Sequence, residues 1–154
     1  MTERTPSSTQ VEMTQMVLPG QTNMHGTAFG GQILAWIDIA AAVAAERHAG
    51  GPVVTAAFDE VQFVQGVRLA HVLVLRARVN WVGVSSMEVG VRVEGETRGR
   101  AYHATSAYTT FVAIDDEGRP TRVPRLELET DDDRRRWDEG AARAQGRKSR
   151  RKQD

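Results

Sequence analysis

One stretch of the chain decides the fold: residues 31–48 read GQILAWIDIAAAVAAERH. It consists largely of alanine, isoleucine, leucine and tryptophan, and alanine has the highest helix propensity of all residues. Two glycines and then Pro52 follow it, which is a stop signal for a helix. The sequence therefore predicts one long helix from about Gly31 to His48. Its apolar residues lie nearly all round, which is typical of a helix that is buried on most sides.

On either side of this helix the pattern favours strands. The hydrophobic period changes from about 3.6 to 2, which predicts strands at residues 53–64, 71–82, 84–96 and 100–114, after a short strand at 13–18. Successive strands joined by short turns should form an antiparallel meander. One helix against a curved antiparallel sheet is an α+β arrangement. Because such a sheet covers only one side of the helix, we expect a second subunit to cover the rest.

Length and charge indicate a single domain with appendages. The chain has 154 residues and equal numbers of basic and acidic side chains, 20 of each. In residues 131–154, however, 15 of 24 residues are charged, nine of them basic and six acidic. We expect a disordered lead at 1–12, a domain at 13–129, and a charged tail at 130–154 that is a loose helix or disordered. The mildly acidic body disfavours a nucleic-acid partner.

Several classes of site are excluded or disfavoured by composition. The chain has no cysteine, which excludes a disulfide scaffold, a cysteine nucleophile and a thiolate metal site. Its four histidines show no metal-type spacing, so no metal site is predicted. The polar first ten residues lack a signal-peptide core, and the apolar stretch at 33–45 is shorter than the roughly 20 residues that span a bilayer. We expect a cytoplasmic protein with no membrane partner.

Asp38 is the most informative residue, because it lies in the middle of the apolar helix. A buried, unpaired carboxylate costs several kcal/mol, so such groups are usually paired or functional. In one interpretation Asp38 faces solvent or pairs with an arginine. In the other, a carboxylate held in a cleft of low dielectric activates water or attacks an electrophile.

The segment at residues 23–31, NMHGTAFGG, leads directly into the helix. The first N–H groups of a helix have no intrahelical acceptor, and they can bind phosphate or stabilise an oxyanion. The segment is neither a Walker loop nor a dinucleotide fingerprint, and a simple turn with an N-cap is an equally good interpretation. Asp38 follows Gly31 by seven residues, or roughly 10 Å along a helix, so both could reach one extended acyl group.

These residues also form a family pattern. Asn23, Gly26, Phe29, Gly30, Gly31, Ile33, Leu34 and Asp38, with the alanine-rich helix behind them, resemble the hotdog-fold acyl-CoA thioesterases, close to the bacterial and brain-type acyl-CoA hydrolases. The resemblance covers residues 13–126. It implies a hotdog fold, in which a long central helix is wrapped by a curved antiparallel β-sheet. It also implies a homodimer with a continuous sheet, often assembled into a trimer of dimers, with active sites at the dimer interface.

The resemblance implies roles for individual residues. Asp38 would be the general base on water or the nucleophile, Gly30 and Gly31 would donate backbone N–H groups to the thioester oxygen, and Asn23 would orient water or substrate. Residues implied in substrate binding are Gly26, Phe29, Thr55, Ser85, Ser86, Arg122 and Arg125. Coenzyme A is part of the substrate, so no separate cofactor is implied. Two departures are Val84, where the family often has a basic residue, and residues 66–71, which lack the usual Gly-Asp turn.

The leading functional prediction is therefore hydrolysis of acyl-CoA to a free acid and CoA. Two alternatives stay open: a hydratase or dehydratase on the same fold, whose site usually centres on a histidine such as His25, and a non-catalytic acyl-CoA sensor. The side chains predicted to set acyl-chain length are Trp36, Phe58, Phe63 and Trp81.

Overall fold

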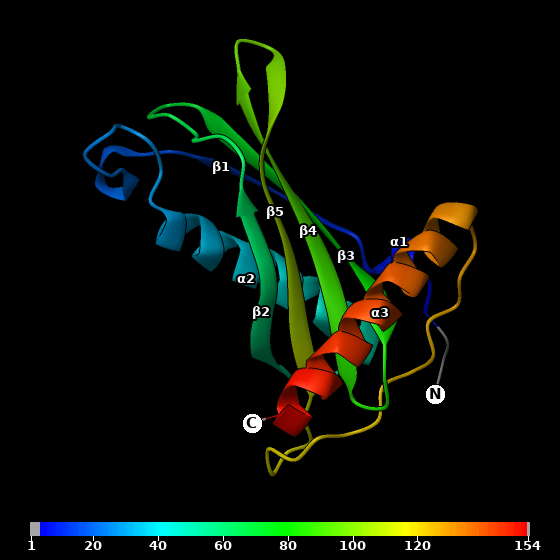
Figure 1. Ribbon diagram of the computed structural model, residues 1–154. Helices are drawn as coiled ribbons and strands as arrows, with labels where there is room; N and C mark the ends of the chain where they lie inside the picture. The colour runs from blue at the N-terminus through cyan, green and yellow to red at the C-terminus, as the bar shows by residue number, and fades with distance from the viewer. Residues whose placement is uncertain (1–3, 154) are drawn as a thin grey trace.

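The computed structural model describes residues 4–153 and is shown in Figure 1. Three α-helices, a short 3-10 helix and five strands make up this part of the chain. They are α1 (Pro6–Thr9), β1 (Val11–Met16), η1 (Pro19–Gln21), α2 (Gly30–Ala49), β2 (Val53–Phe63), β3 (Val72–Val82), β4 (Ser86–Thr97), β5 (Arg100–Ala113) and α3 (Asp131–Gln153). The α+β class, with a long central helix on an antiparallel sheet, is confirmed.

The five strands form one antiparallel sheet in the order β1-β3-β4-β5-β2. The predicted meander is therefore correct only for β3, β4 and β5. The expectation that β2 pairs with the next strand in sequence is wrong, because β2 lies at the far edge beside β5. The connection from β2 to β3 runs from one edge of the sheet toward the opposite edge, where β3 pairs with β1 (Figure 1).

Helix α2 lies across one face of this sheet, and the two form the core. Its side chains Ile33, Ile37 and Ala44 are buried there. The sheet side chains of this core cluster include Leu73, Leu75, Val89, Val93 and Phe111. The helix ends at Gly50, whose φ of 73° is left-handed and whose N–H donates to Glu46 O at 2.8 Å. This is a common helix end, and only glycine adopts it without strain.

The helix is not buried all round within one chain. Ile39 is 54% exposed, and the strand β2 exposes Val54, Phe58 and Phe63, the last of which lies beside Gly30 at the start of the helix. These side chains form an apolar patch over α2 and the edge strand β2. A patch of this kind often marks an interface.

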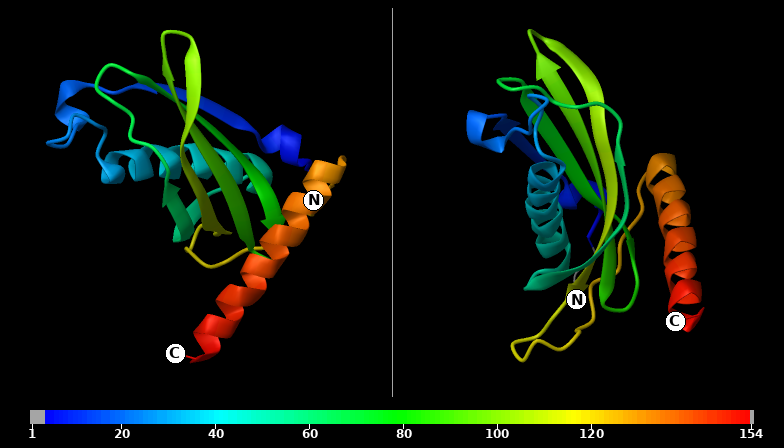
Figure 2. Two further views of the ribbon diagram at one scale, coloured as in Figure 1. Left: turned by 45° about the horizontal axis from the view of Figure 1, so that its top comes forward. Right: turned by 60° about the vertical axis from the view of Figure 1, so that its left-hand side comes forward.

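Helix α3 covers the opposite face of the sheet, as the right-hand view in Figure 2 shows. It begins with a capping box: Asp133 N donates to Thr130 Oγ1 at 3.0 Å, and Asp133 Oδ2 accepts from Thr130 N at 3.2 Å. Of the two forms considered for the tail, the structure has a helix, and it is packed on the sheet through buried side chains such as Ala144.

The N-terminal residues from Arg4 onward also pack on the body. Thr9 Oγ1 accepts from Val79 N at 3.0 Å and donates to Pro6 O at 2.7 Å, and β1 begins at Val11, earlier than predicted. The structure thus differs from the expected disordered lead over residues 4–12, and residues 1–3 lie outside the described part. Among the described helices, none combines the length and apolar character needed to cross a membrane.

Candidate active site

Asp38 lies on α2 and faces β2. Its Oδ1 accepts a hydrogen bond of 2.7 Å from Thr55 Oγ1 of that strand. The carboxylate is half-buried, and the salt bridges found among residues 4–153 include none to it. A hydroxyl donor fixes one oxygen and leaves the second free to accept a proton. This arrangement suits a general base or a nucleophile.

The backbone of β2 is irregular at this point. Its register against β5 shifts between Thr55 and Ala57, and again between Phe58 and Glu60. Bulges re-aim side chains and are frequent next to active sites. The first shift directly follows Thr55, the residue that contacts Asp38.

The side chain of Asn23 forms hydrogen bonds within the loop that precedes α2. Its Oδ1 accepts from the backbone N–H groups of His25 at 2.9 Å and Thr27 at 3.2 Å, and its Nδ2 donates to Thr27 Oγ1 at 3.0 Å. The loop turns at Gly26, whose φ is 77°. The amide side chain is therefore engaged within the loop, and it holds the segment leading into α2 in one conformation.

The start of α2 presents free donors. Phe29 is its N-cap and makes no side-chain capping bond, and the first helical bond runs from Ile33 N to Phe29 O at 3.0 Å. The N–H groups of Gly30 and Gly31 therefore have no acceptor in the helix. A Cβ at Gly30 would meet the ring of Phe63 at 3.4 Å, whereas nothing lies within 4 Å of that position at Gly31. Gly31 is thus open to an approaching carbonyl oxygen.

Asp38 and these donors do not meet within one chain. They are separated by seven or eight residues, which is roughly 10–12 Å along the helix. An oxyanion and the water that attacks the same carbonyl carbon lie much closer together than this. Within one chain, Asp38 and the amide donors are therefore too far apart to act on the same carbonyl group, unlike the expectation from their spacing in the sequence.

The remaining predicted residues lie in separate regions. Arg122 and Arg125 line a pocket of about 430 Å³ that also includes Val84, at the β3–β4 turn. Ser85 and Ser86 belong to this turn, where Ser86 O accepts from Gly83 N at 2.8 Å. Both arginines of this region are exposed, so their guanidinium groups are accessible to an anionic ligand.

Of the four side chains predicted to set chain length, Phe58 and Phe63 lie on β2 and are partly exposed, whereas Trp36 is buried on α2. Trp81 lies on the other face of the sheet, where its ring is 6.1 Å from that of Trp137 on α3. The register shift between Val79 and Trp81 explains the change of face.

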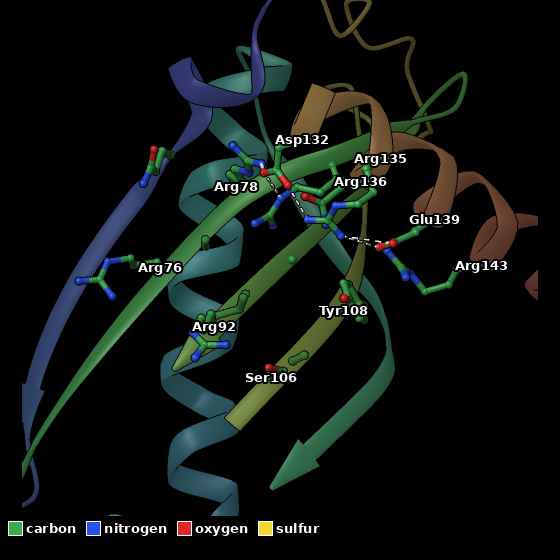
Figure 3. Close-up of a pocket in the computed structure, with 16 residues that line it drawn as sticks. Arg76, Arg78, Arg92, Ser106, Tyr108, Asp132, Arg135, Arg136, Glu139 and Arg143 are labelled. Atoms are coloured by element: carbon green, nitrogen blue, oxygen red, sulfur yellow. Dashed lines mark hydrogen bonds and ion pairs between the residues drawn. The ribbon is translucent and has the colours of Figure 1, made fainter. Parts of the chain in front are cut away.

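A second hollow, drawn in Figure 3, lies between α3 and the outer face of the sheet. Six arginines line it: Arg76, Arg78, Arg92, Arg135, Arg136 and Arg143. Each is paired with a carboxylate, as the ion pairs of Arg78 and Arg136 with Asp132 illustrate. The hollow is therefore nearly neutral, and its lining includes none of the residues around Asp38.

Within residues 4–153, no group of three or more potential metal ligands was found.

Comparison with known proteins supplies the family. The model of the thioesterase superfamily matches residues 25–102, which contain both Asp38 and Thr55. The chain belongs to this superfamily. Its thioesterase fold is shared by the acyl-CoA hydrolase of Staphylococcus aureus, solved with butyryl-CoA and CoA, at a TM-score of 0.92 and 37% identity. That match covers 99% of this chain and 94% of the other. An apo-hexameric acyl-CoA thioesterase gives a TM-score of 0.93 and 37% identity, with 97% of each chain covered.

Comparison with related protein sequences supports the same family. The uncharacterized acyl-CoA thioester hydrolase YkhA of Bacillus subtilis is 38% identical, over 93% of this chain and 84% of its own length. The human cytosolic acyl coenzyme A thioester hydrolase is 32% identical over 90% of this chain, which spans only 38% of that longer protein. The resemblance to hotdog acyl-CoA thioesterases is confirmed.

Proposed function

We propose that this thioesterase hydrolyses acyl-CoA to a carboxylic acid and CoA, with Asp38 as the catalytic carboxylate. The observation that carries the proposal is the Asp38–Thr55 hydrogen bond of 2.7 Å on a helix whose open N-terminus offers amide donors. The carboxylate takes part in no salt bridge found among the described residues and keeps one oxygen free. The bacterial and mammalian relatives named as acyl-CoA thioester hydrolases support the same substrate.

The solved variants of the Staphylococcus aureus hydrolase add independent support. An asparagine, an aspartate and a threonine were each changed to alanine in that protein, at positions 15 and then 17 residues apart. In this chain Asn23, Asp38 and Thr55 are separated by the same 15 and 17 residues. The agreement in spacing favours these three residues as the corresponding set.

In the reaction, the N–H groups of Gly30 and Gly31 bind the thioester oxygen and stabilise the negative charge that develops there. As general base, Asp38 takes a proton from water while the water oxygen attacks the carbonyl carbon. The C–S bond then breaks, the CoA thiolate leaves and takes up the proton held by Asp38, and the acid is released. As nucleophile, Asp38 would instead form an anhydride that water hydrolyses. Thr55 holds the carboxylate in position in both cases.

Two copies of the chain complete the site. Within the described residues, strand β2 pairs on one side only, and its exposed apolar residues form a patch with Ile39. Pairing β2 with a second β2 extends the sheet, covers the patch, and brings Asp38 of one copy toward Gly30 and Gly31 of the other. A homodimer is therefore the smallest active unit. The hexameric relative supports its assembly into a trimer of dimers.

Coenzyme A lies along the surface outside this interface. Gly26 and Phe29 flank the entrance to the helix start of one copy, and Ser85, Ser86, Arg122 and Arg125 of the other copy, which supplies Asp38, contact the CoA arm. The human relative is named as a cytosolic protein, which supports a cytoplasmic location.

The decisive experiment is Asp38→Asn, which is nearly isosteric and cannot accept the proton. Release of free thiol from acyl-CoAs of increasing chain length should fall by about 10²-fold or more. Glu46→Gln is the matched control, because Glu46 is an exposed carboxylate on the same helix and should leave the rate unchanged. Full activity in the Asp38→Asn protein would exclude the mechanism.

Two further readouts separate the alternatives. A single turnover in ¹⁸O-water labels the Asp38 carboxylate only if it is the nucleophile. Hydration of an unsaturated acyl-CoA without thiol release would indicate a hydratase, and calorimetric binding without any turnover would indicate a sensor. His25 is exposed in the loop, five residues before the helix begins, which does not favour a hydratase.

A further inference from the structure

A cavity of about 600 Å³ lies beside the loop that leads into α2. It is formed where the connection between β2 and β3 faces the β4–β5 hairpin. Its wall includes Thr27, Arg68, His71, Arg100 and Tyr102. The sequence patterns had singled out only its 66–71 segment, as a departure from the family turn.

The charged side chains that line this cavity are basic. Its lining contains Arg68, Arg100 and His71 but no carboxylate, and Glu96, next to the lining residue Thr97, is not part of it. Among residues 4–153, neither arginine takes part in a salt bridge or side-chain hydrogen bond found in the structure. This distinguishes the cavity from the hollow under α3, where every arginine is paired. A guanidinium with free donors is well suited to phosphate.

The hairpin that carries Arg100 has a defined backbone geometry. Arg100 follows a tight turn at Arg98 and Gly99, whose φ values are 49° and 75°, and pairs with Thr97. Such a two-residue turn fixes the hairpin geometry. A Cβ at Gly95 would lie 2.2 Å from the Tyr102 ring, so the ring sits directly on the hairpin backbone.

Tyr102 and His71 form a polar wall between the two arginine-bearing segments. Their Oη and Nδ1 atoms are 3.1 Å apart, and the rings meet edge-on at 6.4 Å. The Tyr102 hydroxyl is protonated at neutral pH and can donate, and burial raises its pKa further above the ordinary value.

The cavity is joined to the reaction centre through the backbone. Thr27 forms a β-bridge with Arg68, and Leu69 N donates to Gly26 O at 3.0 Å. Thr27 also receives the hydrogen bond from Asn23 and lies three residues before Gly30. The arginines therefore lie on the side of the loop that leads to the helix start, and Thr27 of that loop lines the cavity. In CoA esters the pantetheine arm separates the thioester from the phosphates.

We infer that Arg68 and Arg100 bind phosphate groups of the CoA part of the substrate, with His71 and Tyr102 as additional polar contacts. This inference rests on the proposed function. It also gives a physical reason why Val84 is tolerated where relatives often have a basic residue: the phosphates are neutralised from this loop and hairpin.

The test compares two substrates that share one acyl group. Acyl-CoA carries the phosphates, whereas acyl-pantetheine has the same thioester and arm without them. In Arg68→Gln and Arg100→Gln, the ratio of kcat/KM for acyl-CoA to that for acyl-pantetheine should fall by about tenfold each, mainly through KM. Acyl-3′-dephospho-CoA then tells whether the 3′-phosphate or the diphosphate is bound.

Arg98→Gln is the matched control, because it removes the same charge from the same hairpin outside the cavity lining. It should leave the ratio within about twofold of wild type. An unchanged ratio in Arg68→Gln and Arg100→Gln, or an equal fall in Arg98→Gln, would overturn the inference.

Failure of the proposed function is recognised separately. If the wild-type protein hydrolyses neither ester, calorimetric titration with CoA still decides the inference. Weaker binding of CoA by the two variants, with no such loss for pantetheine or in Arg98→Gln, supports a phosphate site. Competition of inorganic phosphate alone, with CoA binding unaltered by the substitutions, contradicts it.

Discussion

The two long helices lie on opposite faces of one sheet and are held there by different forces. Helix α2 contacts the sheet with apolar side chains such as Ile37 and Ala44, which are fully buried. Helix α3 adds buried charge to its few apolar contacts: the fully buried Glu88 on β4 accepts hydrogen bonds of 2.8 and 2.7 Å from Arg143. Apolar burial is non-directional, whereas a buried ion pair fixes one register and is costly to break.

The contacts of α3 extend across the sheet. Arg78 on β3 pairs with Asp132 at 2.7 Å near the start of the helix. Toward its end, Arg147 is 3.3 Å from Asp59 of β2, and both side chains are almost buried, at 11% and 7% exposure. A Cβ at Gly140 would lie 3.2 Å from the Glu88 carboxylate, so glycine permits the close approach there. The helix therefore connects β3 to the strand that carries Thr55.

The largest expected effect is from Arg143→Met, which leaves Glu88 buried without its main partner. We expect a loss of roughly 3–5 kcal/mol in the free energy of unfolding, measured by denaturant titration. Arg134→Gln is the control, because its pair with Asp131 is exposed and should contribute less than about 1 kcal/mol. The double variant with Glu88→Leu should recover much of the loss. If Arg143→Met is no worse than Arg134→Gln, the outer helix is not held by this pair.

A smaller effect is expected for Ile37→Val on the inner helix. Removal of one buried methylene should cost roughly 0.5–1.5 kcal/mol through lost burial and a small cavity. The same change at the exposed Ile39 should have little effect on the isolated subunit. The two variants, compared by denaturant titration at low and high salt, should show no added salt dependence, since no charge is involved. A strong salt dependence would contradict the apolar description of this face.

The smallest effect concerns His48, which is fully buried in the last turn of α2 with Nε2 at 2.8 Å from Pro124 O. Burial lowers the pKa of His48 below its ordinary value of 6.5, Arg4 lowers it slightly, and the Pro124 carbonyl partly opposes this. The folded state thus keeps His48 neutral while the unfolded state binds a proton. Stability should therefore be full above about pH 6.5 and fall as the pH decreases below that value.

The measurement is the melting temperature at pH 7.5 and pH 5.5. Each kcal/mol lost should lower it by roughly 2–4 °C. His48→Gln should reduce the difference between the two pH values, whereas His25→Gln, at an exposed position, should not. Equal pH dependence in all three proteins would remove His48 as the cause.

Much of the inner face could be predicted from the sequence. Helix α2 and all five strands lie within two residues of their predicted bounds, because their hydrophobic periods are strong. The position of β2 beside β5 could not be predicted, since alternation sets which residues are buried but not which strands pair. Trp81 changes face because of a bulge that leaves no mark in the period. Thr55 was implied only by family resemblance, as a substrate-binding residue, and its hydrogen bond to Asp38 is seen only in the structure.

The docking of helix α3 on the outer face of the sheet was not predicted, for a different reason. Charge blocks such as those of residues 131–139 have the same composition in a solvated tail and in a docked helix. What docks α3 is Glu88, 55 residues before Arg143, and an alternating strand would be expected to turn this carboxylate to water. The cavity of Arg68 and Arg100 likewise joins two turns that are distant in sequence. Only the folded sheet brings these groups together.

The way α3 spans the sheet has a consequence for synthesis on the ribosome. All five strands leave the exit tunnel before α3 does, so the sheet and α2 can assemble on the nascent chain while Glu88 and Asp59 still face water. Both carboxylates become buried only when the last helix emerges with Arg143 and Arg147. Docking of α3 then follows assembly of the sheet, and until it occurs the strand that carries Thr55 lacks the contact between Asp59 and Arg147 on its outer face.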